Sequence, residues 1–303
     1  MKTVVIFGGS GFVGRHIIRR IVKNGYKIIV PHQKPTNEAS LKLFGDTGQI
    51  TPFKFKSLNE KKIINIINYS DAIINLKTQW DEKKISYKKG ILDFNIELVD
   101  IIKKNNKNNQ FIYFSGLGID NPNDSDRSSS IYSSEKYIEK NLINSSIIRP
   151  GVIIGGGDNF LKNLLPLFKI SFFIPLFGSG VTKFQPVFID DVSLAVNKIV
   201  KFSIKGNNTY EFIGNEIFSY IYLYKYLAKC MNKTRVLVPL PLSIVKVGVS
   251  ILSKTPFSPL TPEQLRLFEN DNIASNNYKS LQDLHINPQD LKEIIKKIIK
   301  KNT

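Results

Sequence analysis

Thr3-Val4-Val5-Ile6-Phe7-Gly8-Gly9-Ser10-Gly11-Phe12-Val13-Gly14 is the stretch of sequence that decides the fold. It opens with an apolar run, typical of a strand buried on both faces of a parallel sheet. Gly8, Gly11 and Gly14 then follow at the spacing of a turn that leads from a strand into a helix. In such a turn the first glycine permits a tight bend, the second lets a pyrophosphate approach the backbone, and the third lets the helix pack closely. The stretch therefore predicts a dinucleotide-binding turn with the phosphates at a helix N-terminus.

Short apolar runs alternate with amphipathic stretches through the first half of the chain, as in repeated βαβ units. Apolar residues recur at helical spacing over 14–24 and 96–103, which predicts helices packed on a sheet. We therefore expect an α/β fold of the Rossmann type, a doubly wound parallel sheet with ligands at the carboxyl ends of its strands. The expected strands are 3–7, 27–30, a weaker one over 51–55, 72–76, 111–115 and 146–149.

The regular alternation ends near residue 150, and loops rich in glycine and proline follow, such as 155–157 and 175–180. Loops of this kind commonly build a lobe that contacts a substrate or a partner. The predicted organisation is a nucleotide-binding Rossmann domain over 1–150 and a smaller C-terminal lobe over 151–303, which partly completes the sheet.

Composition excludes several classes of protein. The 303 residues include one cysteine, Cys230, and three histidines, so we expect no intramolecular disulfide, no Cys/His metal site and a reducing, cytoplasmic compartment. We expect no secretory signal, because the first apolar run is short and leads straight into the glycine turn, and no apolar run reaches the roughly 18 residues that a spanning helix requires. The net charge is +18, but the lysines are scattered among asparagines and isoleucines, as in 104–109. Dispersed charge predicts a solvated surface and no nucleic-acid partner.

The end of the second expected strand bears on the choice of cofactor. NAD sites usually place a carboxylate there for the ribose 2′-hydroxyl, whereas NADP sites present cations to the 2′-phosphate. The strand ends Val30-Pro31-His32-Gln33-Lys34, with no carboxylate before Glu38. Lys34 could pair with a 2′-phosphate, so NADP(H) is preferred. NAD(H) stays open as the second choice, because a loop lysine is also an ordinary exposed residue.

Tyr132 and Lys136 form a candidate catalytic pair, since residues four apart share one face of a helix. A lysine ammonium favours the phenolate form of a nearby tyrosine, which could then act as general acid or base. Ser115, at the end of the fifth expected strand, is the candidate hydroxyl of the same site. Gly116-Leu117-Gly118 follows it, so the donor that would polarise a substrate is open between Ser115 and one of Ser128, Ser129 and Ser130.

The glycine turn, the Tyr132–Lys136 pair and Ser115 together resemble the extended and atypical short-chain dehydrogenases/reductases, over nearly the whole chain. Within that superfamily the chain is most similar to the nucleotide-binding accessory subunits of respiratory complex I and their bacterial relatives. Several runs carry this resemblance: Gly8 to Arg15, Val30-Pro31, 43–49, Ile148-Arg149-Pro150, Gly155 with Asp158-Asn159-Phe160, 185–192, 259–266 and Asp271-Asn272.

The resemblance implies a nucleotide held for structural reasons, in a peripheral subunit or assembly companion of complex I. The alternative is an active NADP(H)-dependent reductase or an epimerase/dehydratase acting on a small carbonyl or a sugar nucleotide. An arginine that commonly closes the second strand in this family is absent, which puts the NADP preference in doubt. The residues expected to contact the dinucleotide are Gly8, Ser10, Gly11, Phe12, Val13, Gly14, Lys34, Leu76, Ser115, Tyr132, Lys136 and Pro150.

Two expected helices lie in the carboxyl-terminal third. The apolar stretch 240–252 is too short to span a bilayer and predicts a buried or interfacial helix. Residues 291–301 alternate isoleucine pairs with lysine pairs, which predicts a basic amphipathic helix. Such a helix could rest on anionic lipid at the cytoplasmic face of the inner membrane, or on a membrane complex. It could equally pack its isoleucines on its own domain. Asp190 or Asp191 is expected to cap one further helix, and Thr261-Pro262 to begin another.

Overall fold

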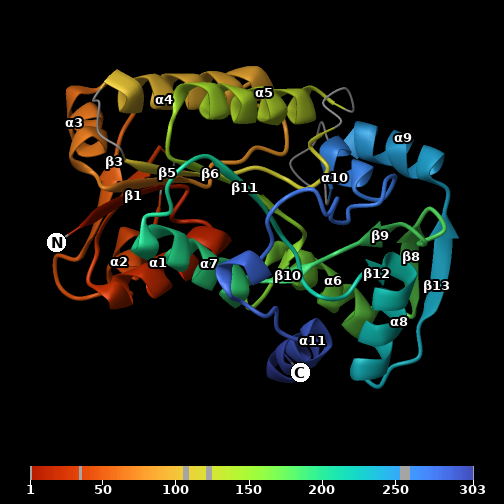
Figure 1. Cartoon of the computed structure of the whole chain (residues 1–303). Coiled ribbons are helices and arrows are strands. Elements are labelled where there is room, and N and C mark those ends of the chain that lie inside the picture. Colours follow the sequence, from red (N-terminus) through yellow and green to blue (C-terminus); the bar gives the residue numbers. More distant parts are fainter. Residues whose placement is uncertain (1, 34–35, 105–108, 121–124, 253–259, 303) are drawn as a thin grey trace.

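A seven-stranded parallel sheet forms the centre of the molecule (Figure 1), in a computed structural model that describes residues 2–33, 36–104, 109–120, 125–252 and 260–302. The strands lie in the order β11-β6-β5-β4-β1-β2-β3, and every pairing is parallel. The strand order reverses beside β1, which is where doubly wound sheets bind ligands. The strands are β1 (Thr3–Phe7), β2 (Lys27–His32), β3 (Ile50–Lys54), β4 (Ala72–Asn75), β5 (Gln110–Phe114), β6 (Ser145–Pro150) and β11 (Asn208–Phe212). The predicted fold class is confirmed.

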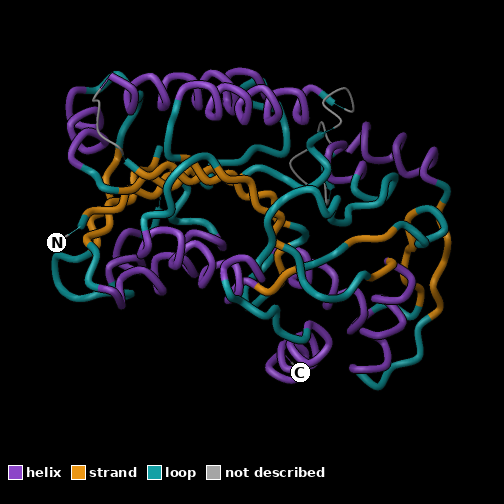
Figure 2. Tube along the Cα trace, viewed as in Figure 1, coloured by secondary structure: helices purple, strands orange, loops and turns teal. Residues whose placement is uncertain are grey.

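Two helix layers cover the sheet, as Figure 1 and Figure 2 show. Each face of the sheet packs on its own apolar cluster, because the strand side chains alternate between faces: Val4 and Ile6 join one cluster, Val5 and Phe7 the other. One layer contains α1 (Phe12–Ile21), α2 (Glu38–Lys42) and α7 (Ile189–Phe202), with a 3-10 turn over Val22–Asn24. The other contains α3 (Lys61–Tyr69), α4 (Phe94–Lys104), which continues a π-helical turn over Lys88–Asp93, and α5 (Asp126–Asn141).

The second half of the chain builds a lobe beside the carboxyl edge of the sheet, around a third apolar cluster. Among the described residues of this half, β11 alone joins the large sheet, where it pairs with β6. The lobe has three two-stranded sheets: β7 (Ile153–Ile154) with β10 (Val187–Phe188), β9 (Lys183–Phe184) with β12 (Phe218–Ser219), and β8 (Phe173–Phe177) with β13 (Val236–Leu240). Its helices are α6 (Asn159–Ile170), α8 (Tyr220–Cys230), α9 (Leu242–Leu252), α10 (Pro262–Arg266) and α11 (Leu291–Asn302), and a 3-10 turn covers Gln282–Leu284.

Helix starts confirm one prediction and correct another. Thr261 caps α10 in a capping box with Gln264, and Pro262 occupies the first helical position. The prediction that Asp190 or Asp191 caps α7 is wrong, because the cap position is Phe188 and both aspartates lie in the first turn. Asp191 instead accepts hydrogen bonds from the backbone N–H and the side-chain amide of Gln289, both at 2.9 Å. It therefore ties the segment before α11 to α7.

The terminal helix α11 packs on its own lobe. Ile294, Ile295 and Ile299 are 7%, 0% and 3% exposed and belong to the lobe cluster. Of the two alternatives for the isoleucines, packing on the helix's own domain is therefore the one that the structure shows, and the lysine face points outward. By contrast α9 exposes Ile244, Val247 and Ile251, each more than 60% accessible. No described helix is long and apolar enough to cross a membrane.

Candidate dinucleotide site

The turn between β1 and α1 is a cradle of backbone atoms. Gly8 has φ +78°, a left-handed conformation that favours glycine, and the N–H of Gly11 donates to the Gly8 carbonyl at 3.0 Å. No side chain caps the start of α1, and no acidic residue lies in its first turn. The N-terminal N–H groups and the positive end of the helix dipole are therefore directed at the carboxyl edge of the sheet, where phosphates can bind.

Gly14 sets how closely α1 lies against the turn. A Cβ at this position would lie 2.5 Å from the Gly9 Cα and 2.7 Å from the Gly8 carbonyl oxygen. Both are backbone atoms that cannot rotate away. Gly8 in turn approaches Leu76, whose N–H donates to the Phe7 carbonyl at 2.9 Å. The structure thus brings the glycine turn and Leu76 together as sequence reasoning expected, and their role as cofactor contacts stays a prediction.

The edge beside the end of β2 is more mixed in charge than the sequence suggested. His32 is 8% exposed, and its Nε2 lies 2.8 Å from the Glu38 carboxylate, so a carboxylate does stand at this strand end. Glu38 is the first carboxylate after the strand in the sequence, and the structure brings it to the strand end. Gln33 bridges to the Lys77 ammonium at 3.2 Å and to the Lys56 carbonyl at 2.9 Å. Lys34 lies outside the described residues.

Buried polar groups stand where β4 and β5 end. Asn75 is fully buried; it donates to Asn95 at 2.8 Å and accepts from the Lys77 N–H at 3.0 Å, which fixes the backbone after Leu76. The Ser115 hydroxyl is buried and has no hydrogen-bond partner within the described part of the chain. A buried unpaired hydroxyl at the carboxyl edge is a group that a bound ligand would satisfy. The cradle and this hydroxyl both fit a dinucleotide.

The candidate pair on α5 lies beside the buried stripe of the helix: Tyr132 is partly buried against the apolar cluster of this face of the sheet, and Lys136 is exposed. The buried stripe of α5 contains Ile131, Glu135 and Ile138, and at roughly 100° per residue neither Tyr132 nor Lys136 falls on it. The Lys136 side chain is 53% exposed and its ammonium pairs with Glu139 at 2.9 Å. That hydrogen bond is the main cause that raises the pKa of Lys136. The ammonium lies 5.4 Å from the Tyr132 ring centroid. The catalytic assignment of the pair stays a prediction.

Arg127 is the polar side chain that sequence reasoning missed. It lies one turn before Ile131 on the sheet-facing side of α5. Its Nε donates to the Gln79 carbonyl at 2.8 Å, its Nη2 lies 3.3 Å from the Thr78 hydroxyl, and the guanidinium stacks 3.9 Å from the Trp80 ring centroid. These contacts hold the cation against the loop that follows Leu76. Apolar periodicity gave no signal for it, because the buried stripe of α5 contains the polar residues Ser130, Ser134 and Glu135.

A second arginine, Arg149, forms ion pairs with two carboxylates at the end of β6. Both oxygens of the fully buried Glu135 carboxylate accept from it, at 3.0 and 2.6 Å, while Asp120 pairs with its other side at 2.8 Å. The Tyr278 ring covers the guanidinium at 4.5 Å, and the Tyr278 hydroxyl donates to Asp120. This network joins α5, β6 and the C-terminal segment. It positions Pro150, the next residue, at the strand end.

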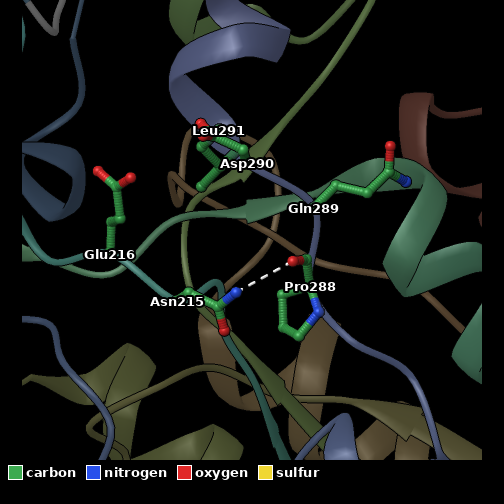
Figure 3. A pocket seen from close by; sticks show the side chains of 6 residues that line it. All are labelled: Asn215, Glu216, Pro288, Gln289, Asp290 and Leu291. Carbon is green, nitrogen blue, oxygen red and sulfur yellow. Dashed lines mark hydrogen bonds between the residues drawn. The ribbon is translucent and has the colours of Figure 1, made fainter.

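Two further cavities lie outside the cradle. One, of about 380 Å³, separates the loop 81–87 from the start of α10. The other, of about 180 Å³, lies between the segment after β11 and the start of α11 (Figure 3), where Asn215 donates to the Pro288 carbonyl at 3.0 Å. Of the predicted cofactor residues that the structure describes, none lines either cavity. Among the described residues, no group of His, Cys, Asp and Glu side chains is arranged to hold a metal ion.

Comparison with known proteins finds a family model and relatives that match most of the chain. The family described as NAD dependent epimerase/dehydratase matches residues 4–211. "NADH dehydrogenase [ubiquinone] 1 alpha subcomplex subunit 9, mitochondrial" of Arabidopsis thaliana is 28% identical, covering 95% of this chain and 74% of its own length. The mouse protein of the same name is 25% identical, covering 94% and 76%. The family match and the cradle together support binding of a nicotinamide dinucleotide.

Solved structures share the fold at low sequence identity. UDP-glucuronic acid 4-epimerase from Bacillus cereus, in complex with UDP-glucuronic acid and NAD, superposes with a TM-score of 0.72 at 17% identity, covering 99% of this chain and 100% of that one. UDP-N-acetylglucosamine 4-epimerase from Methanobrevibacter ruminantium M1 gives a TM-score of 0.74 at 14% identity, covering 99% and 97%. At these identities the likeness shows the fold alone.

Proposed function

We propose that this chain, which belongs to the NAD dependent epimerase/dehydratase family, holds NADP(H) as a structural ligand and serves as a subunit or assembly partner of a respiratory NADH dehydrogenase. The observation that carries the proposal is the alignment of about 95% of the chain with the accessory subunits named above. A role shared with these subunits would depend on the lobe as well as on the cradle, and the alignment includes both.

The structural role of the nucleotide follows from where it would bind. The cradle joins β1 to α1, and Leu76 and Ser115 stand on neighbouring strand ends, so one ligand would cross-link several elements of the sheet. A ligand that binds only the folded state stabilises it by roughly 4 kcal/mol at a thousandfold excess over its dissociation constant. Such a ligand can be retained without being turned over.

NADP(H) is the cofactor favoured by the edge beside β2. The Lys77 ammonium stands next to Gln33, and Lys34 follows in the sequence, so a 2′-phosphate would meet cations there. Glu38 is the opposing feature, and its carboxylate is engaged by the His32 ring at 2.8 Å. A carboxylate held in this way has less capacity left to accept from a ribose hydroxyl, which is the contact that favours NAD(H).

A location at the cytoplasmic face of the inner membrane fits the proposed partner. The lysines of the last turns of α11 lie on its outer face and could contact an acidic surface of the complex or of the bilayer. Neither contact requires the buried isoleucines. The proposal therefore places the chain as a peripheral component held by charge and by protein contacts.

Affinity purification from gently solubilised membranes of the source cells tests the assembly role. We expect subunits of the NADH dehydrogenase, identified by mass spectrometry, to copurify with the tagged chain. The affinity tag without the chain, expressed in the same cells, controls for non-specific capture. If the chain is recovered entirely apart from membranes and no dehydrogenase subunit accompanies it, the assembly role is wrong.

The alternative function, an active reductase or epimerase, depends on Tyr132 and Lys136. The epimerase folds named above favour it only at the level of architecture. It predicts a carbonyl or sugar-nucleotide substrate that oxidises or reduces bound cofactor, with turnover abolished in Tyr132→Phe and nucleotide affinity kept. Full turnover in Tyr132→Phe, or no turnover with any member of a substrate panel, would reject that alternative.

A further inference from the structure

Arg127 places a permanent positive charge at the carboxyl edge of the sheet. Its Nε and Nη2 are held by the backbone of Gln79 and the hydroxyl of Thr78, and one face of the guanidinium is covered by Trp80. These three residues belong to the loop that leaves β4 directly after Leu76 and Lys77. The cation is therefore attached to the same loop that forms the wall of the glycine cradle at Gly8. Three contacts hold the guanidinium in this position, so the position does not depend on any single contact.

The topology assigns this edge to one half of a bound dinucleotide. In a doubly wound sheet the dinucleotide crosses the switch point with its pyrophosphate at the first turn, and its adenosine ribose lies at the end of the second strand. In this chain β2 lies on one side of β1, and β4 and β5 lie on the other. The nicotinamide half must then extend over the ends of β4 and β5. Both Arg127 and the unpaired Ser115 hydroxyl lie on that side.

The two redox forms of the cofactor differ in charge on that half. The oxidised nicotinamide ring carries a positive charge and the reduced dihydropyridine ring carries none, while the phosphates are the same in both. We propose that Arg127 makes the site selective for the reduced cofactor, because its charge repels the oxidised ring and does not oppose the reduced one. This inference rests on the proposed binding of NADP(H) and deepens it, since it explains why a retained cofactor would stay reduced.

The charged and titratable groups near Arg127 do not neutralise its positive charge. Burial lowers the pKa of the guanidinium, and Glu263, Tyr113 and Tyr87 oppose that effect. An arginine with a usual pKa above about 12 stays protonated at neutral pH. Glu263 is the one carboxylate among these three groups, and it is shared with other partners: it accepts from Ser125 at 3.0 Å and pairs with Arg266 at 3.4 Å. It weakens the positive potential and does not cancel it.

The ratio of the dissociation constants for NADP⁺ and NADPH is the direct test. The phosphates are the same in both forms and cancel in this ratio, and the long-range charge of the protein is largely screened at about 0.15 M salt, where the screening length is about 8 Å. One unit charge changes a binding constant tenfold at separations of up to about 12 Å, for an effective dielectric constant of about 20. We expect the wild-type chain to bind NADPH at least tenfold more tightly, measured by calorimetry with the full chain.

Variants at two positions give opposite expected shifts. Arg127→Gln should bring the ratio close to one, whereas Arg127→Lys, which keeps the charge, should preserve most of the preference. Glu263→Gln removes the opposing carboxylate and should increase the preference for NADPH. Arg235→Gln is the matched control, because Arg235 is an arginine held by a main-chain carbonyl, that of Phe168, in the lobe. Thermal unfolding of each variant establishes that it is folded.

The reduction potential supplies a second readout. A tenfold preference for the reduced form raises the two-electron potential of the bound cofactor by about 30 mV relative to the free cofactor. The inference is overturned if wild type binds both forms equally, or if Arg127→Gln keeps the wild-type ratio while folded. If wild type binds neither form, the proposed function itself fails. Equal binding of both forms therefore overturns the inference about Arg127 alone, whereas absence of binding overturns the proposed function as well.

Discussion

Replacing Gly14 by alanine tests the close approach of α1 to the glycine turn. The added Cβ would meet the Gly9 Cα at 2.5 Å, and an ordinary van der Waals contact begins at 3.4 Å, so helix and turn must separate by up to 0.9 Å. Forced overpacking of this kind costs about 1–3 kcal/mol. Helix propensity acts in the other direction, since alanine is favoured over glycine by about 1 kcal/mol in a helix interior. We expect a net loss of stability and a loss of dinucleotide affinity, because the N–H groups of α1 move with the helix.

Chemical denaturation and nucleotide titration of Gly14→Ala measure both effects. Gly156→Ala is the matched control, since a Cβ there meets nothing within 4 Å and the backbone is outside the left-handed region. That variant should be neutral or slightly stabilised, as expected when an unstrained glycine is replaced. A Gly14→Ala protein as stable as wild type, with unchanged affinity for NADPH, would refute the packing argument.

The remaining predictions concern a buried ion pair, cofactor choice and acid stability. Glu135→Gln removes the buried charged partner of Arg149 and should lower the free energy of unfolding by roughly 3 kcal/mol. Glu139→Gln removes an exposed ion pair and should lower it by less than about 1 kcal/mol. Equal losses in chemical denaturation would contradict this difference. Lys77→Met should weaken NADPH binding about tenfold and leave NADH binding nearly unchanged in parallel titrations. If the affinities for NADPH and NADH fall equally, Lys77 does not recognise the 2′-phosphate. Backbone hydrogen bonds from Lys56 and Ser57 lower the pKa of Glu60, so its contribution to stability is present above the unfolded-state pKa near 4.5 and is lost as pH falls through the folded-state pKa. The stability difference between wild type and Glu60→Gln should therefore shrink on acidification, and a difference independent of pH would rule this out.

The sheet could be predicted from the sequence because its strands are nearly continuous apolar runs. The β1 strand has the predicted bounds. The expected ends of β2 and β6 were too early, because His32 and Pro150 do not resemble strand residues, yet both pair in the sheet. Tertiary context overrides residue preference at such positions.

The phase of α5 could not be predicted, and that is why Arg127 was missed. The buried stripe of this helix contains Ser130, Ser134 and Glu135, which are polar, so apolar periodicity does not show which face meets the sheet. Glu135 is buried because Arg149 pairs with it, a contact between distant parts of the chain. The contact between Glu38 and His32 could not be predicted either, because it joins the first turn of α2 to the end of β2.

Purification of the chain under native conditions, followed by release and identification of any bound nucleotide, tests most directly whether the β1–α1 cradle holds NADP(H). We expect close to one NADP(H) per chain, mostly NADPH. A chain that carries no nucleotide, and that binds none of NAD⁺, NADH, NADP⁺ and NADPH in solution, would contradict it.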